Sequence, residues 1–440
     1  MKTTKRPIRT TVFVFLILVV AFSFSTLTKQ NQSRAANNTD AKGCVFLTVM
    51  GREKTGNDFI YNTPAKVTTS IDSGLAWLAK AQQSNGGWGS GSHSHQDIMD
   101  PHAVKTDPAT TAMVAMAILR SGSTLTSGKY SMLLKNSLNY LMDCVEKTPA
   151  NESNITSETN TQIQVKLGGN IDVILTSQFL SNIMPSLEQD VKLKERATKC
   201  LASCVNKIEK AQDSNGSTKG SGWAGVLQSS LATSALESAQ STGGVVVDQK
   251  ALDKSRDFQK GNYDDKSGNV NTAMGAGVVL YAVSSSNRAA AQDARKVQEE
   301  VEKAKKDGKL EKDAPVTTAN LEKIGYNKTD AMKANTSYNI YNSTKKVAQD
   351  QKVMNGFGSN GGEEFLSYLQ TGESMVINKD NDWKKWYDNI SGHLINIRNT
   401  DGSWSGHHCI SSPVFCTASC LLILSINNDI EKLTAIGKTK

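Results

Sequence analysis

Two segments near opposite ends of the chain share one pattern, and this repeat constrains the fold more than any other feature. Residues 77–88 read WLAKAQQSNGGW and precede the apolar segment TTAMVAMAIL at 110–119. Residues 395–404 read INIRNTDGSW and precede CTASCLLIL at 416–424. Each copy predicts a helix, a polar turn with Gly and Trp, and a second helix rich in small apolar residues. Self-similarity of this kind is typical of repeat architectures.

Between and around these copies, apolar periodicity and turn signals predict six successive helix pairs. Asp107 followed by Pro108 fits the start of one helix, with Asp as the N-cap and Pro at the first helical position. The dense mixed charge of residues 297–309 is most simply a solvated helix extension. The predicted pairs are 67–83 with 107–121, 129–147 with 170–185, 190–212 with 225–241, 248–259 with 271–305, 317–350 with 362–371, and 379–398 with 413–426.

The two helices of each pair differ in composition. The second helices begin with Ala, Thr, Ser or Gly, which let helices approach closely, whereas the first helices carry more Lys, Glu and Asp. An inner and an outer ring would need this difference. We therefore expect an all-α fold, an (α/α)6 toroid in which every connection from a first to a second helix lies at the same end.

The shared motif resembles the α/α-toroid superfamily of squalene and terpene cyclases and protein prenyltransferase β-subunits. It stands here as Gln82, Gly86 and Trp88, and again as Gly402 and Trp404 before the helix from Thr417. The likeness spans roughly residues 65–430 and is closest to exported bacterial proteins that carry this repeat. The structural interpretation of Trp88, Trp404 and Trp223, which stands in a looser copy, is that each fills the gap between neighbouring helix pairs.

The N-terminus predicts export to the periplasm, the cell envelope or the medium. Lys2, Lys5, Arg6 and Arg9 precede a short apolar run that begins at Val12, and they supply half of the formal net charge of +8. The rest of the chain shows no basic stripe with aromatic residues, so we expect no nucleic-acid partner. The predicted organisation is a signal peptide or membrane anchor at 1–27 (apolar over 11–27), a polar linker at 28–65, the toroid domain at 66–430 and a tail at 431–440.

The resemblance implies a terpenoid-cyclase activity only where an Asp-x-Asp-Asp acid motif precedes an inner helix. The nearest string here, residues 262–265, reads Asn-Tyr-Asp-Asp and lacks the first acid. Only 6% of the residues are aromatic, which equips a cavity poorly for stabilising carbocations. A proton-initiated cyclase is therefore disfavoured.

Ring closure would make the first and last helix pairs neighbours and bring their connecting loops together. Zinc ligands are typically His and Cys, and five of the six histidines lie in these two loops. Glu363 and Glu364 begin the adjoining inner helix, where the helix dipole alone also favours acids. The loops hold His93, His95, His102, His407 and His408, with Cys409 and Cys416 following.

Three interpretations of this loop region stay open. Cys409 and Cys416 are ligands of a metal with His407 and His408, or they form a disulfide, which export would favour, or they do neither. We expect a protein that binds a peptide, lipid or glycan in a central cavity. The alternative is a zinc-dependent transferase or cyclase-like enzyme. The mouth of the cavity would be lined by Trp88, His93, His95, His102 and Trp404, and an enzyme would use Glu363 or Glu364 as acid or base.

Overall fold

The computed structural model describes residues 61–220, 222–356 and 360–435, and helices are the only regular elements in this part of the chain. No helix in these ranges is both long enough and apolar enough to cross a membrane. The predicted signal or anchor at 1–27, nearly all of the linker at 28–65 and the end of the tail lie outside the described residues.

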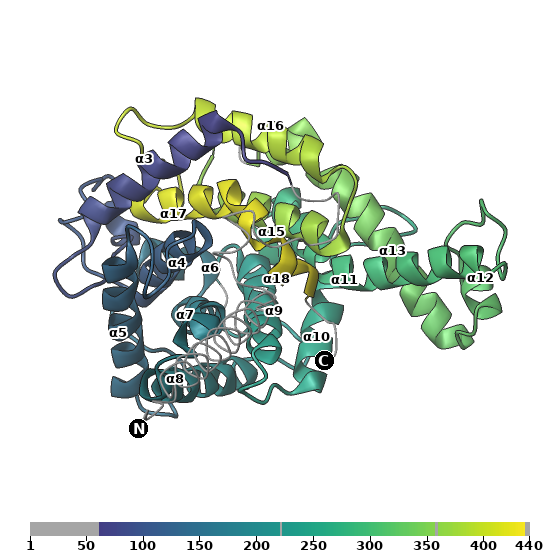
Figure 1. The fold of residues 1–440 in the computed structure, drawn as a ribbon, viewed down its shortest axis with the longest axis horizontal. Helices are drawn as coiled ribbons and strands as arrows, with labels where there is room; N and C mark the ends of the chain where they lie inside the picture. The colour runs from purple at the N-terminus through teal and green to yellow at the C-terminus, as the bar shows by residue number, and fades with distance from the viewer. Residues whose placement is uncertain (1–60, 221, 357–359, 436–440) are drawn as a thin grey trace, which may run out of the picture. The chain divides into compact units, whose positions relative to one another are not determined.

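In the described part of the chain, twelve long helices follow the predicted pairs (Figure 1). The first helices carry a polar side. In α8, for example, the buried apolar residues fall at positions 197, 200, 201, 204, 205 and 208, which is one helical stripe. The second helices α4, α15 and α17 are buried along their whole length. In order, the pairs are α3 (Ala65–Ala81) and α4 (Pro108–Arg120), α5 (Ser131–Lys147) and α7 (Ile171–Ile183), α8 (Val191–Lys210) and α9 (Gly225–Ser241), α10 (Gln249–Lys260) and α11 (Val279–Lys306), α13 (Lys328–Ala348) and α15 (Gly362–Asn378), and α16 (Trp383–Asn396) and α17 (Pro413–Leu424).

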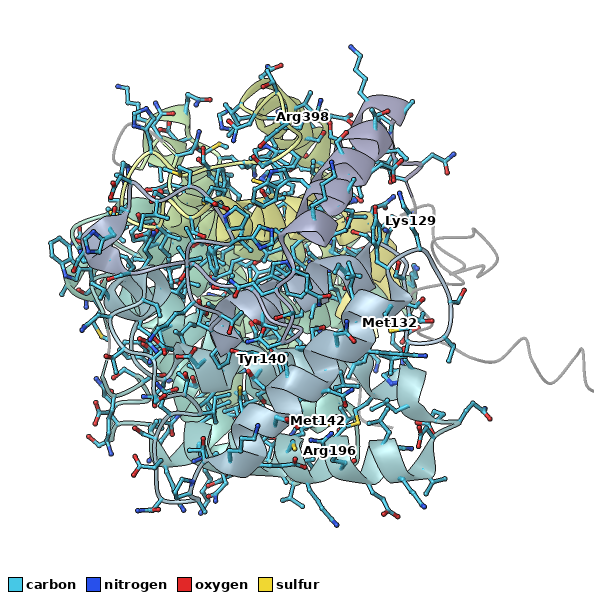
Figure 2. All side chains as sticks on the ribbon, turned by 90° about the vertical axis from the view of Figure 1, so that its left-hand side faces the viewer. Lys129, Met132, Tyr140, Met142, Arg196 and Arg398 are labelled. Atoms are coloured by element: carbon cyan, nitrogen blue, oxygen red, sulfur yellow. The ribbon has the colours of Figure 1, made fainter. Side chains whose placement is uncertain are left out.

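The second helices contact one another in chain order, from α4 through α7, α9, α11 and α15 to α17. The last of them, α17, also contacts the first, α4, so the series of contacts closes. Each first helix packs against the second helix of the preceding pair, as α8 does against α7 and α3 against α17. Neighbouring first helices also interact through surface charges: Arg196 of α8 lies 2.6 Å from both Asp143 and Glu146 of α5 (Figure 2).

The start of α4 agrees with its predicted cap. Asp107 has extended backbone angles, and its Oδ1 accepts a hydrogen bond of 2.7 Å from the Thr110 N–H. Pro108 takes the first helical position, where its missing N–H leaves no bond unmade. The local sequence therefore fixes where this inner helix begins.

Two local predictions are wrong. Helix α11 begins at Val279 rather than at 271, because the short 3-10 helix η3 (Ala273–Gly275) and the left-handed Ala276 (φ 51°) interrupt it. The charged extension of α11 is also not a simple solvated helix. Val297, Val301 and Ala304 lie on one side of it and form a small second core with α12 (Thr318–Lys323) and the start of α13.

Short helices complete the described part. The predicted tail is helical at its start, where α18 (Ile430–Ala435) contacts α15 and buries Leu433. The others are α6 (Gln162–Leu167), α14 (Gln351–Met354) and the 3-10 helices η1 (His93–His95), η2 (Met184–Leu187) and η4 (Ile426–Asp429).

Candidate ligand-binding site

The connections from first to second helices meet through hydrogen bonds. The Ser411 hydroxyl donates to the Gln96 carbonyl at 2.8 Å, and the Ser411 N–H donates to Gln162 Oε1 at 2.8 Å. The His407 N–H donates to the Asn360 carbonyl at 2.8 Å. Four connecting segments that are distant in sequence therefore lie together at one end of the inner helices, which we call the loop end.

The histidines of the loop end do not converge on one point. His102 is exposed, and its ring lies 3.0 Å from the Lys80 carbonyl oxygen. Nowhere in the described ranges do three or more His, Cys, Asp or Glu side chains lie close enough to hold a metal ion. The other loop-end histidines are His93 and His408, both half-buried, and His95 and His407, both exposed.

The two cysteines proposed as ligands are free thiols. Cys416 is buried and directs its Sγ at the Ile410 carbonyl oxygen, 3.3 Å away. Burial holds the pKa of the Cys416 thiol well above its ordinary range. The predicted ligand set of His407, His408, Cys409 and Cys416 is thus not assembled, and the residues present do not fit a zinc ion.

Glu363 and Glu364 are both buried at the start of α15. Glu364 accepts hydrogen bonds of 2.8 Å from the Tyr281 hydroxyl and from the Gly361 N–H, which closes a capping box. Glu363 accepts one from the Ile410 N–H at 3.3 Å. Burial, followed by the charge of Glu364, raises the pKa of Glu363 to about 7. This carboxyl can therefore gain or lose a proton near neutral pH.

Trp88 and Trp404 occupy equivalent places in the two motif copies. The Trp88 indole N–H donates to the Leu78 carbonyl at 2.9 Å, and the Trp404 indole N–H donates to the Leu394 carbonyl at 2.8 Å. Both side chains are completely buried. This burial agrees with their structural interpretation and leaves neither indole exposed to a ligand.

Trp223 does not belong to this set, and its interpretation as a third buried plug is wrong. The backbone N–H of Trp88 donates to the hydroxyl of Thr111, on the second helix of the first pair. At the equivalent place in the third pair, the backbone N–H of Thr218 donates to Ser229 Oγ at 3.0 Å. Thr218 is therefore the counterpart of Trp88. Trp223 lies five residues further on and is 64% exposed, which leaves its indole available to a ligand.

The backbone places Trp223 over Lys166. The Gly222 N–H donates to the Leu167 carbonyl at 3.0 Å, and the Ala224 N–H donates to the Lys166 carbonyl at 2.7 Å, so this segment runs along the end of α6. A Cβ on Gly222 would lie 2.5 Å from the Val165 oxygen, so only glycine permits this approach. Lys166 Nζ lies 4.2 Å from the centre of the Trp223 ring.

Lys166 is the electrostatic centre of the loop end. Its side chain is only 4% exposed, and its charge acts on Glu363, Cys409 and His93. Burial, with the charge of Glu363, raises the pKa of Cys409 to about 11, and Lys166 opposes this shift. Burial, with the charge of Lys166, lowers the pKa of His93. We call Gln162, Lys166, Trp223, Glu363 and Cys409 the Lys166 site.

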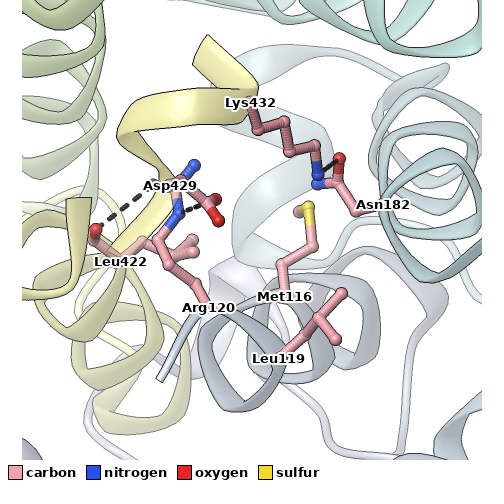
Figure 3. Close-up of a pocket in the computed structure, with 7 residues that line it drawn as sticks. All are labelled: Met116, Leu119, Arg120, Asn182, Leu422, Asp429 and Lys432. Atoms are coloured by element: carbon pink, nitrogen blue, oxygen red, sulfur yellow. Dashed lines mark hydrogen bonds and ion pairs between the residues drawn. The ribbon is translucent and has the colours of Figure 1, made fainter. Parts of the chain in front are cut away.

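A second group of buried charges lies at the other ends of the inner helices (Figure 3). Arg120 ends α4 and pairs with Glu373 at 2.7 Å and with Asp429 at 2.6 Å. Nearby, Lys432 of α18 bonds Asn182, and burial lowers the pKa of Lys432 to about 8. Because the guanidinium of Arg120 is already satisfied by two carboxylates, we assign this cluster to stability rather than to ligand binding.

Comparison with known proteins adds no further constraint on this site. A scan against models of protein families finds no match to the chain, and a search of curated proteins finds no significant relative. The candidate site therefore rests on the residues and contacts described above.

Proposed function

We propose that residues 66–430 form an (α/α)6 toroid and that the protein is exported. The closed series of contacts from α4 to α17 and back supports the toroid, as does the packing of each first helix on the preceding second helix. The basic and apolar pattern of residues 1–27 supports export. In this arrangement the loop end is one mouth of the toroid.

We further propose that the protein binds a glycan at this mouth, with Trp223 as the stacking surface. The exposure of Trp223 carries the proposal, because an indole that is 64% exposed does not fill the buried position that Trp88 and Trp404 fill. The groups beside it are polar or ionisable, namely Gln162, Lys166 and Glu363, and they suit a ligand rich in hydroxyl groups better than a lipid chain. A sugar ring presents an apolar C–H face to an indole and hydroxyl groups to such neighbours.

The zinc-dependent alternative loses its support. Within the described ranges its four proposed ligands do not lie close enough together to hold a metal ion. In the mouth that we propose, Trp223 contacts the ligand where the sequence predicted Trp88 and Trp404. Lys166 takes the place that was predicted for the histidines of the loops.

The test is a titration of the exported protein with soluble oligosaccharides, namely chitotriose, maltotriose and trigalacturonate, followed by saturation-transfer NMR. At least one should bind, and Trp223→Ala should weaken that sugar about fivefold or more, because an aromatic contact contributes about 1 kcal/mol. Met132→Ala is the control, since Met132 is 65% exposed and stands in α5, which contributes no residue to the Lys166 site. Binding of none of these sugars, or binding that Trp223→Ala leaves unchanged, would refute the proposal.

A further inference from the structure

We propose that the Lys166 site selects acidic sugars, in which a ring carboxylate binds the Lys166 ammonium while the sugar ring rests on Trp223. This inference rests on the proposed function and adds the chemical class of the ligand. Three independent features of the site carry it: a buried cation without a carboxylate partner, a buried amide donor without any partner, and an exposed indole next to the cation.

The Lys166 ammonium lacks the partner that a buried charge usually has. Within the described ranges no carboxylate oxygen lies within 4.0 Å of Lys166 Nζ, although Glu363 is near enough to feel its charge. The contacts of Nζ are the face of Trp223 and the thiol of Cys409. Buried charges in proteins are usually paired, because a lone one is costly to desolvate. An anionic ligand would supply the missing pair.

Gln162 provides a second donor on the same side of α6. Its Oε1 accepts hydrogen bonds from the N–H groups of Ser411 and Ser412, and this pattern fixes the orientation of the amide. Its Nε2 is buried and has no hydrogen-bond partner among the residues that the structure describes. Gln162 and Lys166 are four residues apart, so they share one face of the helix. A carboxylate has two oxygens and can accept from an ammonium and an amide together.

The neighbouring acids do not provide a competing cation site. Glu364 already accepts from Tyr281 and from the Gly361 backbone, and Glu363 accepts from the Ile410 backbone. The other ionisable groups near Nζ are the Cys409 thiol, which is neutral at physiological pH, and the His93 imidazole. Lys166 is therefore the cationic group with which an anionic ligand would pair at this site.

The place of Trp223 favours a sugar acid over a simple anion. The indole is exposed and the ammonium beside it is not, so a ligand contacts the ring first and reaches Nζ, 4.2 Å from the ring centre, along its edge. A uronic acid carries its carboxylate directly on a ring with an apolar C–H face. Inorganic phosphate has the charge without such a face and should bind far more weakly.

The experiment compares trigalacturonate with its fully methyl-esterified form, which keeps the rings and removes the charge. Binding is measured by calorimetry to the exported protein and to Lys166→Gln, Lys166→Arg and Trp223→Ala. The wild type should bind the acid at least tenfold more tightly than the ester, since hydrogen bonds to charged groups are the stronger ones. Lys166→Gln should abolish this preference, Lys166→Arg should keep most of it, and Trp223→Ala should weaken both sugars.

Lys129→Gln is the matched control, because Lys129 also lies over an aromatic ring, at 5.2 Å from the centre of Tyr130, but outside the loop end. It should behave like the wild type. Equal binding of acid and ester, with both weakened by Trp223→Ala, would overturn the acidic-sugar inference and leave the glycan proposal standing. A preference for the acid that survives Lys166→Gln would also overturn it. Failure of every sugar tested would refute both.

Discussion

Replacing Arg120 by Met should lower the free energy of unfolding far more than the same change at a surface arginine. The guanidinium lies 2.7 Å from Glu373, 2.6 Å from Asp429 and 3.2 Å from the Leu422 carbonyl oxygen. All three charged side chains are at most 7% exposed. The substitution removes this cation from two buried carboxylates, although Glu373 keeps a longer contact of 3.9 Å with Arg288. Breaking a buried pair in this way costs about 3–5 kcal/mol in the free energy of unfolding.

Arg196→Met is a closely matched control. Arg196 also binds two carboxylates, Asp143 and Glu146, each at 2.6 Å, but these side chains are 32–48% exposed. Water screens such pairs and takes over their hydrogen bonds, so the loss should stay below about 1 kcal/mol. The two variants have the same amino-acid change and similar ion-pair distances, so the difference between them isolates burial.

The assay is urea unfolding of each variant at neutral pH, followed by circular dichroism and intrinsic fluorescence. Arg120→Met should lower the unfolding midpoint strongly at unchanged slope, and Arg196→Met should barely move it. The double variant Arg120→Met/Glu373→Gln should recover part of the loss, because one stranded charge is removed. Equal effects of the two single variants, or no recovery in the double one, would refute the reasoning.

Three further predictions concern the loop end. Burial raises the pKa of Glu363 from its ordinary 4.5 to about 7, so ionising this carboxyl destabilises the fold. Relative to Glu363→Gln, the wild type should lose roughly 3 kcal/mol in the free energy of unfolding as the pH rises from 4.5 to 8. Urea unfolding measures this difference, and parallel pH profiles of the two proteins would contradict it. Trp404→Ala should destabilise the fold by about 3–5 kcal/mol and Trp223→Ala by less than about 1 kcal/mol in the same assay, and similar losses would contradict their different burial. Cys409 and Cys416 should both react with a thiol reagent in denaturant without reductant, whereas a protected pair would reveal a disulfide.

Helix positions could be predicted from the sequence because they depend on local chemistry. Asp107 and Pro108 mark the start of α4, and its small apolar residues mark it as an inner helix, which is buried throughout. The equivalent roles of Trp88 and Trp404 could also be predicted, since both stand in the same Gly-and-Trp turn. Repeats make such predictions strong, because each copy tests the other.

The site could not be predicted in the same way, because it depends on which distant segments meet. Trp223 is the exception, because residues 212–218 (QDSNGST) match residues 82–88 (QQSNGGW) position by position and so put Thr218 in the place of Trp88. The hydrogen bond from Thr218 to Ser229 on the next helix agrees with this alignment. Lys166 lies in a connection without strong periodicity, and its place beneath Trp223 depends on backbone bonds between two loops. The histidines were conspicuous by type, but type alone did not bring them together.

The two ends of the inner helices differ in how their buried charges are satisfied, and this difference separates stability from binding. At the end near α18, Arg120 and Glu373 are paired within the chain, so each buried charge has a partner of opposite sign. At the loop end, Lys166 and the Gln162 amide are buried without such partners, and a fold optimised only for stability would have filled those positions with apolar residues. Unpaired buried donors that persist beside an exposed indole are best explained by a partner that arrives from solution.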